Sequence, residues 1–583
     1  MQQSGDMVEA ARFVSCWRSI GGSLSVNERE TRTLDRAMRR LARVGTTILM
    51  MPNLIASLRI AFHLIFFASP LHAAEAAPSP RTPMQYRAAA GEAAWTSIDF
   101  LDLVRTSRSD CAIKPGNLVQ CAAPLKINAL EKKLVLGHGT IVEFLDSHAG
   151  KGGVVLSGAV DVVLSDIQIG WLGGGARDPL IPGAQRIQSF GNVVACGNSE
   201  PGGVLSLDLA LEGMQPLGSV SVWDDALGWP WYRAAPDKFE VHLPKNTLSR
   251  FSAGRSDCVP RLTSLVGRRV LVRHIVSTNP AFLCWGCRNV AVEKVRVTSA
   301  PGMAFVFGNG GSLLTLRDDV VAPKCSPNCL HPEPSVTADA SHFSAVGSNI
   351  VLEGNDFGWQ GDDGANITGL LIPARAEADT SARWILVDEQ WRGRLSSFAA
   401  GNGILVFDRG LSALGSAEVL AVAPSEGRVR VSQLPVNKSE LIIARADMIP
   451  TNIVVRNNHF HDNRARGILM GGSDALIENN EIDRVTMEAI LIPADTGPWY
   501  EGPGATHVEI KGNRIADVNR FPAELDYPSA ISAGASIDKG YIGAVGTPIR
   551  DIVVEGNSFK NIYSAPDVPI FFGRGVQGGS TEK

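Results

Sequence analysis

The chain has little net charge and lacks a long apolar run, and these two shortages exclude several classes of protein. Its 583 residues carry a formal charge of only −4, and Lys and Arg are scattered along the sequence. A nucleic-acid groove or a polybasic membrane patch needs clustered positive charge, so neither is expected. Aromatic residues are also few, at 7%, but 11 of them are Trp, and several Trp stand near polar clusters, as they do in sugar-binding sites.

One apolar run near the start is too short for a comfortable membrane span and instead resembles an export signal. It covers 60–71, follows Arg59, and precedes Ala-x-Ala sites that allow cleavage after Ala73 or Ala76. A basic residue, an apolar run of this size and such a site are typical of a secretory signal peptide. The mature protein is therefore expected in a periplasm or outside the cell. The alternative is an uncleaved anchor with a long cytoplasmic tail.

Eight cysteines follow the predicted signal, an even number that suits disulfides in an exported protein. A local Cys111–Cys121 bridge is one expected pairing, although connectivity does not follow from sequence. Plain buried thiols fit the sequence as well. The alternative is a four-cysteine zinc site. Its ligands would be Cys284, Cys287, Cys325 and Cys329.

Abundant glycine and a recurring strand pattern predict a solenoid. The 59 glycines imply many tight turns. From Trp95 onward, runs recur that have a polar starter, an apolar-rich stretch, and then mostly Gly or Asn, a polar residue and a large apolar one. The closest copies lie about 22 residues apart, a period typical of a β-solenoid whose strands bury alternate residues. The copies are 161–169, 289–297, 349–357, 452–460, 474–482, 507–515 and 551–559.

An asparagine stands at the seventh place of five copies and predicts a ladder. Asn tolerates the left-handed conformation that a strand needs where it bends. Its amide can also bond to the equivalent Asn one rung away, as in stacked sheets. The expected fold is all-β, a right-handed parallel β-helix, rather than a sandwich or propeller with hairpins about every 8–12 residues. The five are Asn355, Asn458, Asn480, Asn513 and Asn557.

Two segments break the period and are expected to be small antiparallel β-barrel or sandwich domains inserted in solenoid loops. Both contain β-like runs and turn signals without the Asn pattern, and an insertion in a loop costs little. Translation is expected to start at Met50 or Met51, so 1–49 would be an upstream extension that is not native. The signal peptide is 50–76, and 77–94 is a leader or linker. The β-helix is expected at 95–199, at 276–370 with the aspartates described next, and at 449–583, and the inserted barrels at 200–275 and 371–448.

Three aspartates lie about one rung apart in the stretch 337–369. Asp339 stands 23 residues before Asp362 and 24 before Asp363, so the three should meet on neighbouring rungs about 4.8 Å apart. With a lateral offset this suits the separation of about 6.5–9.5 Å in an inverting glycosidase, where a water fits between base and sugar. Close carboxylates raise one another's pKa, which suits a proton donor. The alternative is a simple turn with Asp339 as a cap.

Calcium is another interpretation of the three aspartates. A polysaccharide lyase on a β-helix gathers carboxylates around Ca²⁺ to acidify the proton beside a uronate carboxylate. Such a lyase also needs an Arg or Lys base on the same face, and the stretch 337–369 offers no clear candidate.

Polar and aromatic groups further along are candidates for holding a sugar. Two guanidinium groups follow a rung, carboxylates can accept hydrogen bonds from sugar hydroxyls, and an aromatic ring can stack on the apolar face of galactose. Loop packing is the alternative for the aromatic pair. The candidates are Arg464, Arg466, Asp495, Trp499, Tyr500 and Glu501.

Four motifs occur in order: Asp339-Ala-Ser-His-Phe, Gly361-Asp-Asp-Gly-Ala-Asn-Ile-Thr-Gly, Arg464-Ala-Arg-Gly-Ile-Leu and Trp499-Tyr-Glu-Gly-Pro-Gly. Together they resemble the inverting α-1,3-galactosidases of glycoside hydrolase family 110, which act on terminal α-galactose, including the blood-group B type. That family is a right-handed β-helix interrupted by small β-barrels, so the resemblance would cover most of the chain from about residue 95.

The resemblance implies a role for each matching residue. Asp339 resembles the general acid, and Asp362 and Asp363 resemble the pair that activates a water. Thr368 stands where family members have a His, a departure that affects specificity more than mechanism. The positions that match sugar-holding residues are Asn366, Arg464 or Arg466, and Glu501.

The sequence as a whole predicts an exported inverting glycosidase that removes terminal α-linked galactose and needs neither metal nor cofactor. A polygalacturonase is the nearest rival, but its Gly-His-Gly and Arg-Ile-Lys do not follow Asp363. A calcium-dependent lyase or epimerase and a non-catalytic glycan-binding adhesin are further alternatives. The expected partner is an oligosaccharide or glycoconjugate with terminal α-galactose. We expect no nucleic acid and no membrane span in the mature form, and a homodimer is left open.

Overall fold

The computed structural model describes most of the chain after residue 94, all within one compact unit, Pro80–Lys583. The predicted upstream extension, signal peptide and leader lie outside the described residues. Within the described part, no helix has the length and apolar character needed to cross a membrane. The described ranges are 95–107, 109–145, 152–174, 187–197, 204–209, 219–223, 232–234, 238–242, 248–252, 266–274, 279–328, 333–377, 383–434, 440–497, 499–519, 529–537, 541, 543–563 and 568–582.

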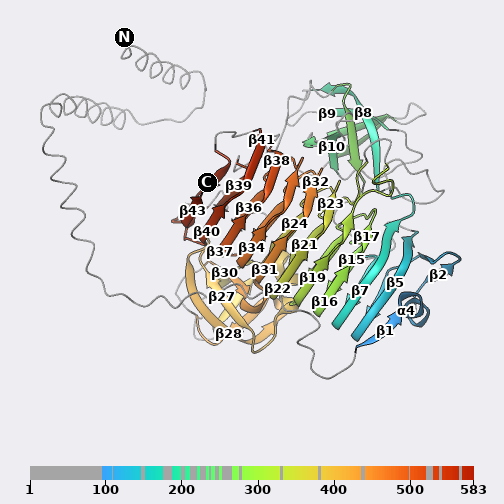
Figure 1. Ribbon diagram of the computed structural model, residues 1–583. Coiled ribbons are helices and arrows are strands. Elements are labelled where there is room, and N and C mark those ends of the chain that lie inside the picture. Colours follow the sequence, from blue (N-terminus) through green and yellow to red (C-terminus); the bar gives the residue numbers. More distant parts are fainter. Residues whose placement is uncertain are drawn as a thin grey trace, which may run out of the picture. The chain divides into compact units, whose positions relative to one another are not determined.

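The predicted parallel β-helix is confirmed. A rung has up to three short strands, here called its first, second and third strands, and equivalent strands of successive rungs pair in parallel (Figure 1). The first strands are β16 (Arg288–Glu293), β19 (Ser312–Arg317), β22 (Ser348–Glu353), β31 (Thr451–Arg456), β34 (Ser473–Glu478), β37 (Thr506–Lys511), β40 (Ile549–Glu555) and β43 (Val576–Glu582). The long β5 (Glu131–Phe144) and β7 (Val160–Trp171) run through both the first and the second positions.

The second and third strands complete the rungs. The second strands are β17 (Arg296–Val297), β20 (Val320–Val321), β23 (Asp356–Gly358), β32 (His459–His461), β35 (Glu481–Asp483), β38 (Arg514–Val518) and β41 (Ser558–Ile562). The third strands are β4 (Leu125–Asn128), β6 (Val154–Ser157), β15 (Phe282–Trp285), β18 (Phe305–Gly308), β21 (Ser341–Ser344), β24 (Ala365–Thr368), β33 (Ile468–Gly471), β36 (Ile490–Asp495), β39 (Ile531–Ser536) and β42 (Ile570–Phe572).

Aromatic rings fill part of the interior, one rung above another. Phe307 on β18 pairs with Phe343 on β21, and their rings stack with centroids 4.7 Å apart. Phe357 and Phe460 also meet in register, between the second strands β23 and β32, but edge to face, with centroids 5.9 Å apart. All four side chains are fully buried. In-register pairing thus turns scarce aromatic residues into continuous columns of apolar contact.

The predicted asparagine ladder is confirmed. The Oδ1 of Asn458 accepts hydrogen bonds from both the backbone N–H and the Nδ2 of Asn355, at 3.0 and 2.8 Å. The same pair of bonds links each later ladder residue to the next, through Asn480 and Asn513 to Asn557. Each amide also donates to a carbonyl in the preceding rung, which satisfies a buried polar group at every step.

The left-handed residue of each bend lies one place earlier than predicted. The ladder asparagines themselves do not have a positive φ; the residue before each one does. The bend and the ladder bond fall on neighbouring residues because the ladder amide must point inward while the backbone beside it turns. Gly and Asn are the residues that tolerate this conformation at least cost. The five left-handed residues are Gly354, Asn457, Asn479, Gly512 and Gly556.

The ladder continues into an aspartate. Asp319 is fully buried, and its backbone N–H donates to the Oδ1 of Asn355 at 2.9 Å. Its own Oδ1 accepts from the Val295 N–H at 2.8 Å, while its Oδ2 is buried without a hydrogen-bond partner. Burial holds the pKa of this carboxyl well above its usual value, although the bond from Val295 opposes the shift. An asparagine at this position would carry Nδ2 in place of Oδ2 and could donate a hydrogen bond as the other ladder amides do.

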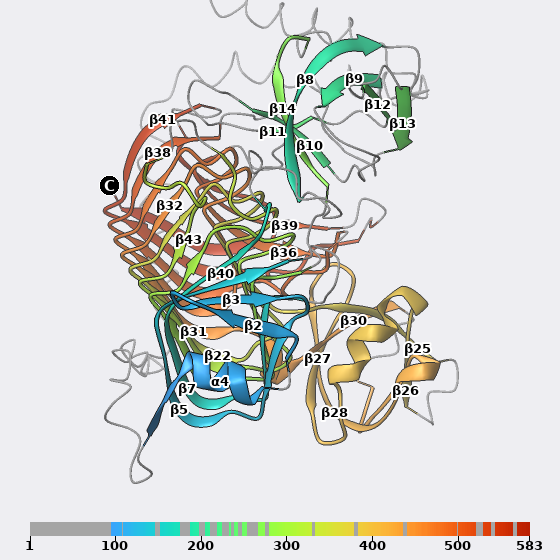
Figure 2. The same ribbon diagram turned by 90° about the vertical axis from the view of Figure 1, so that its right-hand side faces the viewer.

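A closed barrel is inserted between β24 and β31. Its strand order is β25-β26-β29-β28-β27-β30, and neighbouring strands pair antiparallel all the way round, as predicted for this segment (Figure 2). The strands are β25 (Ile372–Ala376), β26 (Trp384–Val387), β27 (Gly403–Phe407), β28 (Ala413–Ala423), β29 (Arg428–Val431) and β30 (Glu440–Arg445). Short 3-10 turns are η4 (Glu389–Ser397), η5 (Pro424–Glu426) and η6 (Ala446–Met448).

The earlier insertion is a seven-stranded sheet in the order β11-β10-β14-β8-β9-β12-β13. It is antiparallel except for the parallel pair β9 and β12, and in the described residues no pairing joins its end strands β11 and β13. Its first strand begins before the predicted boundary at 200. The strands are β8 (Gln188–Gly197), β9 (Val204–Leu209), β10 (Ser219–Trp223), β11 (Tyr232–Ala234), β12 (Lys238–His242), β13 (Leu248–Ser252) and β14 (Arg269–Arg273).

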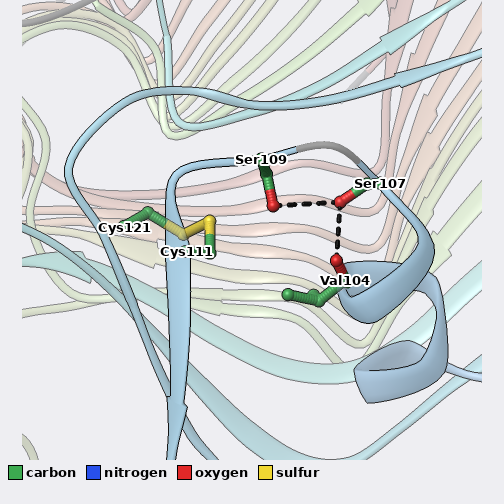
Figure 3. Close-up of a disulfide and its surroundings, with 5 residues drawn as sticks. All are labelled: Val104, Ser107, Ser109, Cys111 and Cys121. Carbon is green, nitrogen blue, oxygen red and sulfur yellow. Dashed lines mark hydrogen bonds between the residues drawn. A yellow bond between two sulfur atoms is a disulfide. The ribbon is translucent and has the colours of Figure 1, made fainter.

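The amino-terminal end of the solenoid has a helix and a hairpin. Strand β1 (Thr96–Asp99) leads into α4 (Phe100–Thr106), which buries Phe100 in the main core. After it, β2 (Cys111–Lys114) and β3 (Leu118–Cys121) pair antiparallel. The predicted Cys111–Cys121 disulfide joins them, beside a hydrogen bond between the Ser107 and Ser109 hydroxyls (Figure 3).

The four-cysteine zinc site is wrong. Cys284 and Cys287 form a disulfide with each other, so their sulfurs are not thiolates that can bind zinc. Cys325 is disulfide-bonded as well, and Cys329 lies outside the described residues. The even number of cysteines, which indicated disulfides, therefore predicted the pairing better than the two closely spaced pairs, which suggested zinc ligands.

We expect the variant Asp319→Asn to be more stable than the wild type. Its Nδ2 would take the place of the unpartnered Oδ2 and donate within the ladder, which is worth about 1 kcal/mol or more of unfolding free energy at pH 7. The folded carboxyl binds its proton to higher pH than an unfolded one, so wild-type stability falls as pH rises above 3.8 toward the raised pKa. The advantage of Asn should grow over that interval, as measured by chemical denaturation.

Asp318→Asn is the matched control, because Asp318 is the exposed neighbour and its left-handed φ suits Asn equally well. Its effect on stability should be small at every pH, because the charge of Asp318 is only a minor cause of the raised pKa of Asp319. An Asp319→Asn variant that is less stable than the wild type at pH 7 would contradict the proposed continuation of the ladder.

Candidate active site

Equivalent positions of four neighbouring rungs carry charged side chains, each just before a third strand. We call these four residues the charged column: Asp339, Asp363, Arg466 and Glu488. Backbone hydrogen bonds fix their register, at 2.9 Å from Ala340 N–H to Asp363 O, 2.9 Å from Gly364 N–H to Arg466 O, and 3.2 Å from Gly467 N–H to Glu488 O. Residues far apart in the sequence thus stand one above another, in the order carboxylate, carboxylate, guanidinium, carboxylate.

The structure brings together the three aspartates that the sequence singled out. Asp339, Asp362 and Asp363 each offer a carboxylate oxygen, and these oxygens lie within 4.8 Å of one another. The Asp363 N–H also donates to the Oδ1 of Asp339 at 3.3 Å. The nearest oxygens are closer than the separation of about 6.5–9.5 Å that we expected for an inverting pair.

Arg273 of the seven-stranded sheet holds the backbone around these aspartates. Its buried guanidinium Nη1 donates to the carbonyl of Thr337 at 2.8 Å and to that of Gly361 at 2.7 Å. Gly361 leaves no room for a side chain, since a Cβ there would lie 2.2 Å from the Thr337 oxygen. The inserted sheet and the lack of a side chain together fix the turn that carries Asp362 and Asp363.

Asp339 forms a buried pair with His342. The His342 Nδ1 lies 2.8 Å from the Asp339 Oδ2, and both side chains are largely buried. Burial raises the pKa of Asp339, the bond to His342 lowers it, and the charges of Asp362 and Glu501 raise it further; the net direction is upward. Burial lowers the pKa of His342, but the hydrogen bond and charge of Asp339 outweigh it and raise that pKa. The pair therefore holds a proton tightly.

Asp363 is buried against Arg466. Its Oδ1 accepts from the Arg466 N–H at 2.9 Å and lies 3.4 Å from the Nη1 of the same residue. Burial raises the pKa of Asp363 to about 8, against the opposing charge of Arg466, and the neighbouring Asp362 and Asp339 add to the rise. On its other side, the Arg466 Nε lies 3.6 Å from the Glu488 Oε2. Arg466 is thus an internal cation between two carboxylates.

Asp362 is the most accessible of the three aspartates. Its side chain is 33% exposed, against 6% for Asp339 and 5% for Asp363. The Arg464 Nη2 donates to the Asp362 Oδ1 at 2.7 Å, and the Arg464 Nε donates to the Gly361 carbonyl at 2.6 Å. A guanidinium partner and contact with water both favour the ionised carboxylate.

The outward face of the third strands continues the site beyond the aspartates. Asn366 on β24 pairs in register with His342 on β21, and both alternate with residues of the apolar core such as Ile367 and Phe343. The Asn366 Oδ1 accepts from the Thr368 hydroxyl at 3.1 Å. Thr368 therefore positions the Asn366 amide. The family that the four motifs resemble has a histidine at this place.

The loop that follows β36 carries the remaining predicted sugar-holding residues and rests on the barrel. The Tyr500 ring packs against Trp391 of η4 at 5.1 Å, and its carbonyl accepts from the Leu371 N–H at 3.0 Å. Trp499 is 69% exposed. Tyr500 is thus the packing residue of the pair, and Trp499 offers a free ring face. Glu501 bridges to Leu370, and its charge acts on Asp339, His342 and Arg466.

Asp495 shapes this loop from inside. Its Oδ1 accepts from the Gly497 N–H at 2.7 Å, and backbone N–H groups of Trp499 and Tyr500 also bond to it. Burial raises the pKa of Asp495 in spite of these bonds, and the charge of Glu501 adds to the rise. These contacts give Asp495 a role in holding the loop that presents Trp499.

Two residues of the site were missed from sequence. His342 lies within a motif that was noted, but its bond to Asp339 was not foreseen; the i, i+3 spacing was the available signal. Glu488 could have been found by aligning rungs, because it holds the same place as Asp363 and Arg466. The same alignment corrects the objection to a lyase, since Arg464 and Arg466 do bring basic groups to the stretch 337–369.

Comparisons with known proteins agree with the fold and with the motifs. A family model described as a right-handed β-helix region matches residues 436–577. Among solved structures, the chain is similar to a mannuronan C-5 epimerase module (AlgE4) of Azotobacter vinelandii, with a TM-score of 0.32, 10% identity and coverage of 80% of this chain and 88% of that one. A polygalacturonase from Erwinia carotovora gives a TM-score of 0.31 at 8% identity, with coverage of 84% and 97%.

Curated relatives are more informative than these structures. An alpha-1,3-galactosidase B of Akkermansia muciniphila is 23% identical over 52% of this chain and 38% of its own length. An alpha-1,3-galactosidase A of Bacteroides fragilis is 23% identical over 54% and 51%, and an alpha-1,3-galactosidase B of Phocaeicola vulgatus is 27% identical over 58% and 60%. The chain therefore spans about half the length of the curated relatives that it matches. The resemblance predicted from four motifs is confirmed: over half its length, the sequence is similar to α-1,3-galactosidases.

Proposed function

We propose that the protein is an exported, exo-acting glycoside hydrolase that removes terminal α-linked galactose with inversion. The observation that carries this proposal is the division of three adjacent carboxyls into different environments. Asp339 and Asp363 are buried with raised pKa values, while Asp362 is accessible and paired with a guanidinium. Adjacent carboxyls with different proton affinities are what acid–base cleavage of a glycosidic bond requires.

Asp339 serves as the general acid. Burial raises its pKa, which favours the protonated form that a general acid needs, and His342 fixes the direction of its carboxyl through the bond at 2.8 Å. The proton passes from Asp339 to the glycosidic oxygen as the bond between that oxygen and the anomeric carbon breaks, so the aglycone departs as an alcohol.

Asp362 serves as the general base, with Asp363 beside it. The Asp362 side chain is accessible to water, and the Arg464 guanidinium donates to its carboxylate. Asp362 takes a proton from a water that attacks the anomeric carbon from the face opposite the leaving group, which inverts the configuration. Asp363, with its pKa near 8, orients that water as a donor, and the closely coupled pair titrates as a unit.

The outer residues hold the galactose. Trp499 offers an exposed ring for the apolar face of the sugar. Asn366, which pairs in register with His342, and Glu501, whose charge acts on Asp339, bond the sugar hydroxyls. Arg466 stays with Asp363 and Glu488, and Asp495 supports the loop. Because the relatives are named α-1,3-galactosidases, the α-1,3 linkage is the first to test. Export rests on the predicted signal peptide at 50–76.

Incubation of the mature protein with a panel of α-galactosides should release galactose as the β-anomer first, seen by NMR before mutarotation. A chelator should not abolish this release, because no step of the proposed hydrolysis uses a metal. An unsaturated product that absorbs in the near ultraviolet, lost on chelation, would instead favour a calcium-dependent lyase, whose case rests on the three carboxylate oxygens within 4.8 Å. Glycan binding without any release would favour an adhesin.

Variants of the three aspartates should separate their roles by the leaving group of the substrate. Asp339→Asn should lower turnover of a natural disaccharide by about 10²–10⁴-fold, and much less for a dinitrophenyl α-galactoside, whose leaving group needs no proton. Asp362→Asn should lower both rates, because both reactions need the activated water.

The exposed Asp474→Asn on β34 is the control and should change neither rate. If Asp363→Asn rather than Asp339→Asn is rescued by the activated leaving group, the acid is Asp363. A near wild-type rate for Asp362→Asn on both substrates would show that it is not the base.

The pH dependence should follow from the raised pKa of Asp339. The acid must be protonated, so kcat/KM on an unactivated galactoside is high below that raised pKa and falls as pH rises through it. With the dinitrophenyl galactoside, the Asp339→Asn variant should lose this alkaline decline. A decline near pH 8 that persists in the variant would point to the proton on Asp363.

A further inference from the structure

A second group of titratable side chains lies on the second strands, away from the charged column. Asp356 on β23 pairs in register with His459 on β32, and Gly358 pairs with His461. His459 and His461 alternate with the buried Phe460, so both project from the same outer face. Their rings stack with centroids 4.2 Å apart.

Three donor atoms of this group converge. The Asp356 Oδ1 lies 3.3 Å from the His459 Nδ1 and 3.0 Å from the His461 Nε2, and the three atoms lie within 4.8 Å of one another. In a tetrahedral zinc site with bonds of about 2.0–2.1 Å, neighbouring ligand atoms are about 3.3 Å apart. The spacing therefore matches two edges of such a site without movement of the backbone.

The other ring nitrogens fix the orientation of both histidines. The His459 Nε2 lies 2.7 Å from the Asp483 Oδ1, and the His461 Nδ1 lies 2.7 Å from the Asp462 Oδ2. An ionised carboxylate only accepts hydrogen bonds, so these outer nitrogens carry the protons. Metal-binding histidines typically have such an outer carboxylate, which turns the lone pair of the inner nitrogen toward the metal.

Arg484 ties the two outer carboxylates together. Its Nε and Nη2 donate to Asp462 at 2.7 and 2.8 Å, and its Nη1 contacts Asp483. With neutral imidazoles, the three aspartates and this one arginine carry a net charge of −2. The inner ring nitrogens and the Asp356 carboxylate face one another, and either protons on the two rings or a cation between the three groups offsets that charge.

The backbone beneath the histidines is shaped to admit them. A Cβ on Gly358 would lie 2.3 Å from Cε1 of the His461 ring, so only glycine leaves room for that ring one rung away. The Trp359 ring meets the His461 ring edge-on at 6.3 Å. On the open side, the Asp356 side chain is 51% exposed and that of His459 is 36% exposed, so water can complete the coordination.

We propose that Asp356, His459 and His461 form a binding site for one divalent cation of the zinc class. Two imidazoles and one carboxylate suit Zn²⁺ or a similar late transition ion rather than Ca²⁺ or Mg²⁺, which take all-oxygen sites. The ion braces the turns that lead into the candidate active site. Asp462 is followed directly by Asn463, whose Nδ2 donates to the carbonyl of Asp362 at 2.8 Å. The proposal stands independently of the galactosidase reaction.

Titration of chelator-treated, full-length protein with Zn²⁺ tests this site. We expect one Zn²⁺ per chain by calorimetry and by metal analysis after dialysis, together with a rise in Tm. His459→Gln and His461→Gln should each remove this binding and the rise in Tm. Asp462→Asn should weaken the affinity by about 10–100-fold, because it releases one ring from its orientation.

His507→Gln is the matched control. His507 also lies between two aspartates, at 3.3 Å from Asp474 and 3.5 Å from Asp551, but it has no second histidine beside it. Its removal should leave the stoichiometry unchanged. If a histidine variant fails to fold, the Co²⁺ spectrum of the wild type and the Asp356→Asn variant still decide the matter, since the site requires a tetrahedral nitrogen–oxygen spectrum that the variant alters.

Three outcomes would overturn the proposal. They are the absence of binding below millimolar Zn²⁺, binding that survives both histidine substitutions, and binding that disappears in Asp339→Asn instead. The last would place the ion among the catalytic carboxylates.

Discussion

The in-register stacking of rungs is the constraint on which the rest of the structure depends. Each strand pairs residue for residue with the rung before and the rung after, so one residue type at one place becomes a column through the molecule. The Phe contacts, the ladder from Asp319 to Asn557 and the charged column are three results of this rule. A slip of one residue in β33 would separate Arg466 from Asp363 and move a core residue outward.

Much of the fold followed from the sequence because the repeat leaves a local signature. The recurring Asn predicted both the ladder and the parallel pairing, and the loss of the pattern predicted both insertions. The left-handed residue was misplaced by one position because sequence shows which residue types tolerate a bend but not which of two neighbours turns inward. Gly354 and Asn457 make the bend, while Asn355 and Asn458 make the bonds. The cysteine pairs failed as a zinc prediction for a similar reason, since spacing alone does not distinguish a bridge from a ligand set.

The candidate site was predictable only within an uninterrupted stretch. No insertion separates β21 from β24, so a spacing of one rung was enough to bring Asp339 near Asp362 and Asp363. Arg466 was recognised as a possible sugar ligand, yet its contact with Asp363 spans 103 residues and depends on where the chain re-enters the solenoid after the barrel. The i, i+3 spacing of Asp339 and His342 and the rung alignment of Glu488 place these side chains near the aspartates, but their burial and charge partners follow only from the folded chain.

The inserted barrel affects the order in which the site can be assembled during synthesis. Its first and last strands pair, with Ile372 opposite Ile443, so the barrel returns the chain to the rung that it left. The ribosome releases the three aspartates well before Arg464 and Arg466. Until β25 and β30 meet, the nascent chain has a dense group of acids without the guanidinium groups that neutralise them. A chain that ended within the barrel would have the three aspartates but neither of the guanidinium groups that contact two of them in the complete fold.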